Sequence, residues 1–261
     1  MDVLLFILSF IVSLVPSILI VIWMYKRKKQ DSLYKKSCTT AVKLGLLCVV
    51  PILVLSGTFA ILNRVLTNTV LANLNPVLLK LIYNFIVIAF VEELVKFIGL
   101  KITLRKKYSE YTWADVVAFM VIIGTMFGLV EDIPYAIDAT PIIMLIRGFT
   151  MGHVGYAFIM GWFYGKRLYT GKKRYGVIAF VLPFVIHGCY DFSLAPEFLA
   201  LNEYFAFFGI TLALLELVCM ALFIRFMIRS RKIERYNTPL ITLEKPQPEG
   251  AAENTTETEG N

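Results

Sequence analysis

Residues 77–100 read VLLKLIYNFIVIAFVEELVKFIGL, an apolar run that holds Glu92, Glu93 and Lys96 in its second half. A helix needs about 20 apolar residues to cross a hydrocarbon core roughly 30 Å thick, so this run is long enough to span a membrane. Ionisable side chains at that depth cost about 2.5–3.5 kcal/mol each on insertion scales. The run therefore predicts a membrane-spanning helix whose charged residues have a function.

Apolar runs of similar length recur along most of the chain. Hydrophobic residues make up 58% of the sequence and charged residues only 17%, against about 25% charged residues in soluble domains. We therefore expect an all-α, polytopic membrane protein with about seven transmembrane helices. The predicted spans are Val3–Tyr25, Leu44–Leu62, Val77–Leu100, Val116–Tyr135, Ile142–Gly165, Val177–Phe192 and Tyr204–Ile228.

Lysine and arginine gather in every second connection between these spans, at residues 26–29, 105–107, 166–174 and 229–235, whereas the alternate connections hold only Arg64. Cytoplasmic loops carry an excess of these residues. The pattern predicts a multi-pass protein of the cell membrane, embedded in the lipid bilayer, with its N-terminus outside and its C-terminus in the cytoplasm. The net charge of +7 is then a topogenic signal, and no basic soluble face indicates nucleic-acid binding.

The composition divides the chain into one membrane domain and one tail. Residues 1–235 form the predicted seven-helix domain, and its motif-bearing core covers about residues 77–195. From Tyr236 onward, Pro, Glu, Thr, Asn and Gly replace the apolar residues. Such a segment cannot bury enough apolar surface to offset its ordering entropy. Residues 236–261 are therefore predicted to be a disordered, acidic cytoplasmic tail.

The charged group of the third span is more than a simple ion pair. Lys96 lies four residues after Glu92 and three after Glu93, within reach of both on a helix. One cation cannot neutralise two carboxylates at this depth, so either one glutamate is protonated or a further partner lies close. The alternative is an ion pair that only helps the helix to pack.

Further ionisable residues lie in the next three spans. The sixth span holds His187 and Asp191 four residues apart, so a carboxylate can orient the imidazole. The fifth span holds His153, and the fourth holds Glu131. A single membrane histidine is often no more than a hydrogen-bonding residue between helices. Together, however, these residues predict intramembrane chemistry at a water-filled cavity that opens outward.

Pairs of glycines four residues apart lie on the two spans that carry Glu131 and His153. They are Gly124 and Gly128, Gly148 and Gly152, and Gly161 and Gly165. Small residues at this spacing let two helix backbones approach closely. We expect the fourth and fifth spans to pack tightly against each other.

Several known intramembrane chemistries are excluded by missing motifs. The chain has no HExxH zinc motif, no GxSG serine motif and no GxGD aspartyl motif. Cys189 lies two residues from His187 and on a different helix face, which argues against a cysteine–histidine pair.

The remaining pattern resembles a known family. Glu92-Glu93-x-x-Lys96 is followed by Phe127-x-x-x-Glu131, by His153 with Arg147 nearby, and by His187-x-x-x-Asp191, in this order on successive spans. This order resembles the PrsW family of glutamic-type intramembrane proteases, which belongs to the superfamily of CAAX prenyl endopeptidases and bacteriocin-processing enzymes. The resemblance covers roughly residues 80–195 and implies a four-helix catalytic core.

The resemblance also implies roles for these residues. Glu92 would activate a water molecule, and Glu93 would support it. His153 and His187 would position the water or stabilise the oxyanion, with Asp191 orienting His187. Glu131 stands where CAAX-type relatives have histidine. Independently of the resemblance, Arg147 lies six residues before His153 and not on its helix face, so it is expected to reach outward to the interface or to contact the substrate backbone.

The same resemblance implies a partner and bears on cofactors. The substrate would be a single-span membrane protein such as an anti-sigma factor, cut near its outer side in the first step of a stress cascade. We expect no cofactor. If a metal ion such as zinc is present, His153, His187 and Glu92 are the ligands to expect.

Three alternatives remain at this stage. A CAAX-type or bacteriocin-processing peptidase of the same superfamily would differ in its substrate. A non-enzymatic membrane scaffold could share the helix core, although the presence of both glutamates favours an enzyme. A proton-coupled transporter also uses buried Glu, His and Asp, but no inverted repeat supports it.

Overall fold

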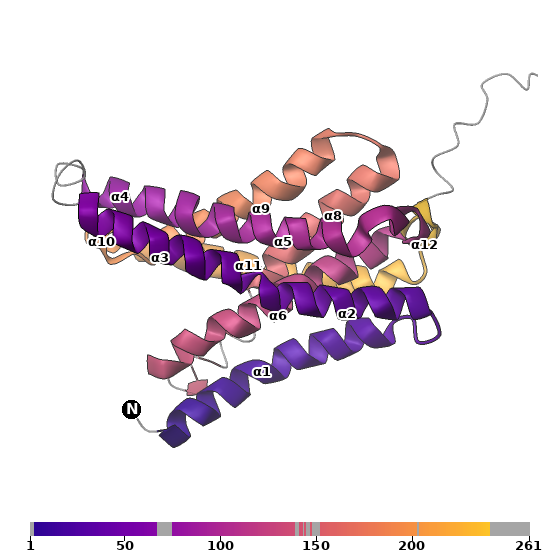
Figure 1. Cartoon of the computed structure of the whole chain (residues 1–261), viewed down its shortest axis with the longest axis horizontal. Helices are drawn as coiled ribbons and strands as arrows, with labels where there is room; N and C mark the ends of the chain where they lie inside the picture. The colour runs from indigo at the N-terminus through magenta and orange to yellow at the C-terminus, as the bar shows by residue number, and fades with distance from the viewer. Residues whose placement is uncertain are drawn as a thin grey trace, which may run out of the picture.

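A computed structural model describes residues 3–66, 75–138, 141–142, 144, 147, 152–202 and 204–240. These residues form a bundle of helices and contain no β-strand, which confirms the all-α class (Figure 1). The α-helices are α1 Val3–Lys26, α2 Ser32–Leu47, α3 Val49–Leu66, α4 Pro76–Ile82, α5 Phe90–Leu104, α6 Trp113–Asp138, α8 Gly152–Thr170, α9 Arg174–Ser193, α10 Pro196–Leu199, α11 Phe205–Ser230 and α12 Glu234–Asn237.

Five described helices are long and apolar enough to cross a membrane: Ile7–Lys26, Ser32–Leu55, Trp113–Pro134, Arg174–Ser193 and Phe205–Ser230. The chain is therefore a multi-pass membrane protein, while the count of seven spans stays a prediction. The third predicted span is divided into α4, a π-helical segment and α5. For the fifth predicted span, the continuous helix α8 begins at Gly152, and most of residues 143–151 lie outside the described residues.

The second helical pass begins earlier than the hydropathy pattern predicts, at Ser32 rather than Leu44. Asp31 caps the helix, and its carboxylate accepts a hydrogen bond of 2.9 Å from the backbone N–H of Tyr34. In the polar turn that follows, the hydroxyls of Thr39 and Thr40 donate to the carbonyl oxygens of Lys35 and Lys36, so these polar groups are paired within the helix.

A π-helical segment, Tyr83–Ala89, lies directly before the glutamates of α5. A π-helix has wider turns than an α-helix, and it occurs mostly as a single turn within an α-helix, often at a functional site. On α9, a Cβ atom added to Gly188 would lie 2.7 Å from the Phe85 ring, so the segment packs closely against α9. The wide turn thus brings the third pass against the helix that carries His187.

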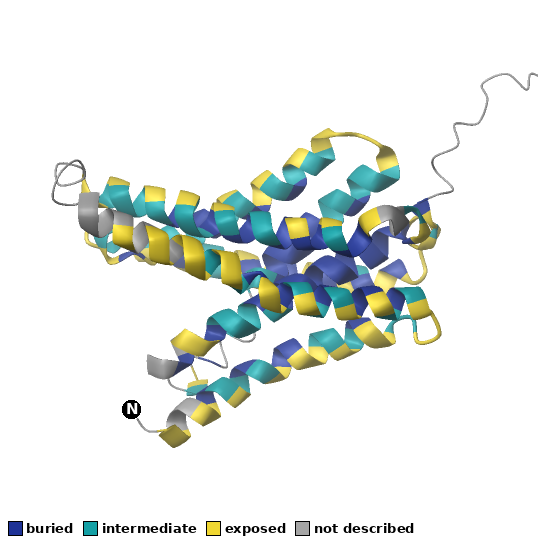
Figure 2. Cartoon of the chain, in the orientation of Figure 1, coloured by how far each residue is buried: buried dark blue, intermediate teal, exposed yellow. Residues whose placement is uncertain are grey.

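Helix α6 is the centre of the bundle. It contacts α1, α2, α5, α8 and α12, and every residue from Trp113 to Thr125 is buried. Figure 2 shows the buried residues in the middle of the molecule, whereas α1 and α3 present exposed residues at its edge. Many of these exposed side chains are Leu, Ile and Val, as expected for a bundle surrounded by lipid.

Helices α6 and α8 approach closely at their glycines, as the glycine spacing predicts. A Cβ atom added to Gly124 would lie 2.6 Å from the Cβ of Ala157. One added to Gly161 would lie 3.0 Å from the Cα of Val117. Gly148 lies outside the described residues. The two helices thus pack backbone to backbone over several turns.

The end of the bundle opposite α10 is joined by a buried carboxylate, Asp115, at the start of α6. Its oxygens lie 3.0 Å from a guanidinium nitrogen of Arg27 and 2.6 Å from the ammonium of Lys28. The side chain of Arg27 also reaches Asn237 on α12, at 3.5 Å. The α1–α2 connection, the start of α6 and α12 therefore lie at one end of the molecule (Figure 1).

The folded domain extends past the predicted boundary at Tyr236. Tyr236 packs its ring edge-on against Trp113, with centroids 4.9 Å apart, and Leu240 is buried. The backbone N–H of Leu240 donates to the carbonyl of Tyr111 at 3.0 Å. These two apolar side chains are too few to raise the hydropathy of a polar segment. The rest of the predicted tail, residues 241–261, lies outside the described residues.

The close contact of α6 and α8 predicts an asymmetry between two glycine substitutions. Gly124→Ala places a methyl group 2.5 Å from the carbonyl oxygen of His153, and overpacking of this kind costs about 1–3 kcal/mol. Gly57→Ala on α3 is the matched control, because nothing lies within 4 Å of its added Cβ. Thermal unfolding in detergent should show a lower midpoint for Gly124→Ala only. Equal midpoints would contradict the close packing.

Candidate active site

The charged residues of α5 lie together as the helical spacing predicts. The ammonium of Lys96 is fully buried and donates to Glu93 Oε1 at 2.7 Å. It lies 3.6 Å from Glu92 Oε2 and 4.2 Å from the centroid of the Phe127 ring. The lysine therefore meets both carboxylates of its own helix and an aromatic face of α6.

Two histidines from other helices are the further partners of this group. Lys96 Nζ lies 2.9 Å from His153 Nδ1 on α8, and His187 Nδ1 on α9 lies 2.9 Å from Glu93 Oε1. Five ionisable side chains from three helices thus form one buried cluster. Lys96 alone cannot neutralise both carboxylates of the third span, and their further partner is His187, which lies on another helix.

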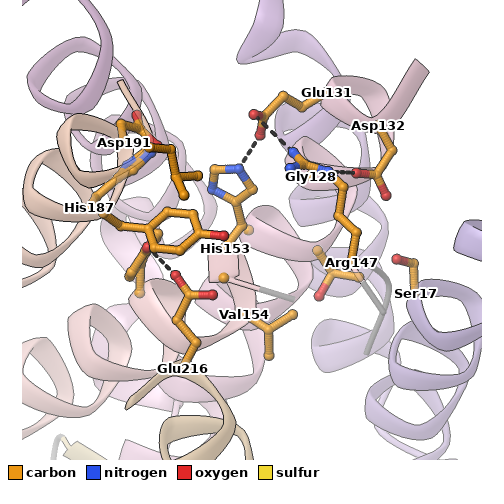
Figure 3. A pocket seen from close by; sticks show the side chains of 16 residues that line it. Ser17, Gly128, Glu131, Asp132, Arg147, His153, Val154, His187, Asp191 and Glu216 are labelled. Carbon is orange, nitrogen blue, oxygen red and sulfur yellow. Dashed lines mark hydrogen bonds and ion pairs between the residues drawn. The ribbon is translucent and has the colours of Figure 1, made fainter. Parts of the chain in front are cut away.

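The hydrogen bonds of His153 define its tautomer. A lysine ammonium can only donate hydrogen bonds. Lys96 therefore donates to Nδ1 of His153, and that nitrogen carries no proton. The opposite nitrogen, Nε2, then donates to the carboxylate of Glu131 on α6 (Figure 3). The ring also packs edge-on against Phe127, with centroids 4.8 Å apart. His153 is therefore held on both nitrogens.

His187 has a different environment on each nitrogen. Nδ1 donates to the carboxylate of Glu93, which can only accept. Nε2 faces Glu92 Oε2 at 3.8 Å and Asp191 Oδ2 at 3.3 Å. Asp191 thus lies beside the imidazole, as its spacing predicts, but Glu93 makes the hydrogen bond to Nδ1. A nitrogen facing two carboxylates requires a proton or a cation among them.

Arg147 is turned toward the site, contrary to the expectation that it reaches outward. Its Nε donates to Asp132 Oδ1 at 2.6 Å, and a terminal nitrogen donates to Glu131 Oε1 at 3.2 Å. Its side chain is 28% exposed. Asp132 and Glu131 are adjacent on α6, so a single guanidinium can meet both carboxylates. Arg147 therefore stabilises the carboxylate that holds His153.

A cavity of about 120 Å³ opens beside the two histidines (Figure 3). Helices α1, α6, α8, α9 and α11 all contribute to its wall. Glu92 does not line it, but its carboxylate lies 3.8 Å from Nε2 of His187, which does. The lining residues are Ser17, Gly124, Thr125, Gly128, Glu131, Asp132, Arg147, Gly152, His153, Val154, Tyr156, His187, Tyr190, Asp191, Leu194 and Glu216.

Comparison with known families matches residues 36–224 to the model described as PrsW family intramembrane metalloprotease. This match covers most of the chain and every helix that carries the buried cluster. The chain belongs to the PrsW family. It is a membrane protein of a protease family, and the ordered residues that suggested the resemblance all fall inside the matched range.

A curated relative supports the same assignment. The protein named Protease PrsW from Clostridioides difficile (strain 630) is 28% identical over 130 residues, which are 46% of this chain and 55% of that protein. The chain thus spans about half the length of the curated relative that it matches. No solved structure matches the chain.

The structure adds two residues that the PrsW resemblance did not include. Tyr156 stacks its ring on His187, with centroids 4.8 Å apart and planes at 19°, and donates its hydroxyl to Glu216 on α11. Tyr156 lies three residues after His153, so helical spacing was the available signal. Glu216 is the one acidic residue of the last apolar run, but its partner lies on another helix.

The description of the PrsW family as metalloproteases implies a metal ion, and the donors here fit one. Glu92, His153 and His187 each offer an atom, and these atoms all lie within 4.8 Å of one another. Glu92 Oε2 is buried and has no hydrogen-bond partner among the described residues. Glu93 supports His187 from behind, as carboxylates do for metal-binding histidines. These are the three residues expected as ligands if a metal ion is present.

The buried ammonium predicts a large loss of stability when it is removed. Lys96→Met leaves Glu93 without its cation, and breaking a buried ion pair costs about 3–5 kcal/mol. Lys101→Met is the matched control, because Lys101 lies on the same helix and is exposed. The free energy of unfolding in mixed micelles should fall for Lys96→Met and stay near wild type for Lys101→Met. Similar values for the two variants would show that the pair is not needed for the fold.

Proposed function

We propose that this PrsW-family protein is an endopeptidase that hydrolyses a peptide bond of a membrane-anchored protein. One observation carries the proposal: a buried cluster of Glu92, Glu93, Lys96, His153 and His187 lies beside a polar cavity in a membrane helix bundle. Such a cluster supplies a base, two imidazoles and a fixed positive charge, and four of its five side chains are buried, while His153 is partly exposed. In peptide hydrolysis, a base of this kind activates water, and hydrogen-bond donors stabilise the charge on the carbonyl oxygen.

Glu92 is the proposed general base. Glu93 accepts hydrogen bonds from Lys96 and His187 on Oε1, and only its Oε2 has no partner among the described residues. Glu92 Oε2, which also has no such partner, lies 3.8 Å from Nε2 of His187, a residue that lines the cavity. Glu92 would take a proton from water as the water oxygen bonds to the carbonyl carbon. The same proton would then pass to the leaving nitrogen as the C–N bond breaks, so that one carboxyl serves both steps.

The other residues of the cluster would hold these groups in place. His153 and His187 are proposed to position the water and to stabilise the negative charge that develops on the carbonyl oxygen. Glu93 and Asp191 orient His187, while Lys96 and Glu131 orient His153. Phe127 covers the ammonium of Lys96 and the ring of His153, which excludes water from that side.

The expectation that no cofactor is needed stays a prediction. In a second form of the proposal, Glu92 is not the free base but a ligand of a metal ion. Glu92, His153 and His187 would hold it, and a bound zinc ion would polarise the water and the carbonyl group. Nε2 of His187 already faces Glu92. His153 has both nitrogens engaged, so ligation through this residue requires it to release either Lys96 or Glu131.

The proposed substrate is a single-span membrane protein such as an anti-sigma factor, cut near its outer side in a first cleavage step. The family resemblance supports this choice, and so does the position of the cavity. Glu131, Asp191 and Leu194 line it from the ends of α6 and α9 that the charge pattern assigns to the outer side. The proposed setting is the cell membrane, with the N-terminus outside and the C-terminus in the cytoplasm.

Two substitutions test the enzyme. Glu92→Gln keeps the size of the side chain and removes the base, and His187→Ala removes the imidazole that faces it. When each is expressed with a single-span anti-sigma factor, cleavage should fall at least about 100-fold, which is the contribution typical of a general base. Immunoblots of the substrate in membranes measure the cut product.

Glu234→Gln is the control for these variants, because Glu234 is exposed on α12. It should cleave like the wild type at equal abundance in the membrane. Undiminished cleavage by both Glu92→Gln and His187→Ala would overturn the proposal. Cleavage of prenylated or bacteriocin-type peptides in place of the single-span protein would assign the chain to the CAAX-type alternative.

Metal removal gives a separate prediction. In the metal-dependent form, purified protein should contain about one divalent metal ion per chain, measured by mass spectrometry of the elements, and a chelator should abolish cleavage until zinc is restored. His187→Ala should lower the metal content strongly because it removes a ligand, and Glu234→Gln should not. Full cleavage by metal-free protein would assign the chemistry to the carboxylates and imidazoles alone.

A further inference from the structure

Glu216 is a buried carboxylate for which the proposed reaction has no use. It lies on α11, is 2% exposed and lines the cavity beside His187 and Asp191. A carboxyl group deep in a membrane helix is costly unless its partners compensate it. A leucine would fill the same place between α11 and α8 at no such cost. The position of this carboxyl group therefore calls for a specific partner.

That partner is Tyr156 of α8, which donates its hydroxyl to Glu216 Oε1 (Figure 3). Gly152, one turn earlier on α8, gives the carboxylate its space. A Cβ atom added there would lie 2.8 Å and 2.9 Å from the two carboxylate oxygens. The first turn of α8 is thus shaped to receive the side chain of Glu216.

The ring of Tyr156 in turn lies flat on His187, with centroids 4.8 Å apart and planes at 19°. An aromatic face offers no acceptor in the plane of the imidazole, so it constrains the ring and leaves both nitrogens to their carboxylates. Nδ1 stays directed at Glu93, and Nε2 stays directed at Glu92 and Asp191. A rotation of this imidazole would break the hydrogen bond to Glu93.

We propose that Glu216 is a positioning residue that acts through Tyr156 to fix the imidazole plane of His187. The chain of contact runs from α11 to α8 to α9 and ends at the nitrogen that faces Glu92. The proposal rests on the proposed function for its effect on cleavage, but the effect on His187 can be measured without cleavage. It assigns the last helix a part in the site.

The kinetic test is a double-mutant cycle between Tyr156→Phe and Glu216→Leu. Each removes the same hydrogen bond, so each should lower kcat about fivefold, the effect of one such bond on the reacting geometry, with KM unchanged. The double variant should be no slower than either single variant. Glu216→Gln still accepts from the hydroxyl and should restore most of kcat, whereas Tyr156→Leu, which also loses the stacked ring, should be slower than Tyr156→Phe.

The spectroscopic test uses the fact that the chain has only two histidines. Protein labelled with ¹⁵N-histidine gives two imidazoles, which His153→Asn assigns. Glu216→Leu should shift or broaden the ring nitrogens of His187 and leave those of His153 in place. Tyr156→Leu should change both imidazoles, because the centroid of the Tyr156 ring also lies 6.0 Å from that of His153. Cys219→Ala is the control for packing, because Cys219 contacts α8 at Gly155, where an added Cβ would lie 3.2 Å from Cys219 Cβ.

The two tests separate the possible failures. Unchanged His187 signals in Glu216→Leu and Tyr156→Leu overturn the positioning role, whatever the cleavage assay shows. Additive losses of kcat in the cycle also overturn it, because the two residues would then act independently. Changed His187 signals in a protein that cleaves no substrate would support the positioning role and count against the proposed function alone.

Discussion

The burial of one ammonium group, that of Lys96, is the constraint on which the site depends. A cation without water needs its charge met by close partners. Here they are Glu93 at 2.7 Å, His153 at 2.9 Å and the face of Phe127 at 4.2 Å. These partners come from α5, α8 and α6, so the charge is met only when three helices have the correct depth and rotation. The fold and the chemistry of the site are therefore coupled at this residue.

The packing of the helices supplies that depth and rotation. The glycines of α6 and α8 let the two backbones approach, so that His153 lies against Gly128 and reaches Lys96. The π-helical segment before α5 sets the third pass against α9, where His187 meets Glu93. A feature of the backbone therefore places each histidine: the glycine contacts place His153, and the π-helical segment places α9 with His187. Side chains on rigid, closely packed helices are held more accurately than side chains on loops.

Much of the site could be predicted because its members follow local rules. Lys96 reaches Glu92 and Glu93 by helical spacing alone, and the order of motifs along the chain identified the family. Arg147 was expected to reach the interface or the substrate backbone, because nothing in its own segment shows that Asp132 and Glu131 face it. The end of the domain was placed too early at Tyr236, since two buried apolar residues in a polar segment leave little signal. Tyr156 was missed because aromatic residues are common in apolar helices.

The sequence by itself determined that this chain is a helical membrane protein, and it predicted most of the ionisable residues that meet at the candidate site. The reason is that the length of an apolar run and the cost of a charge within it are local properties. Only the tertiary structure decided which carboxylate meets which hydrogen-bond donor: Glu93 meets His187, Glu131 meets His153, and Glu216 meets the hydroxyl of Tyr156. These pairings cross between helices, and they depend on the rotation and depth that packing alone sets. The run of residues 77–100 carries Glu92, Glu93 and Lys96, and the helices around it carry their partners.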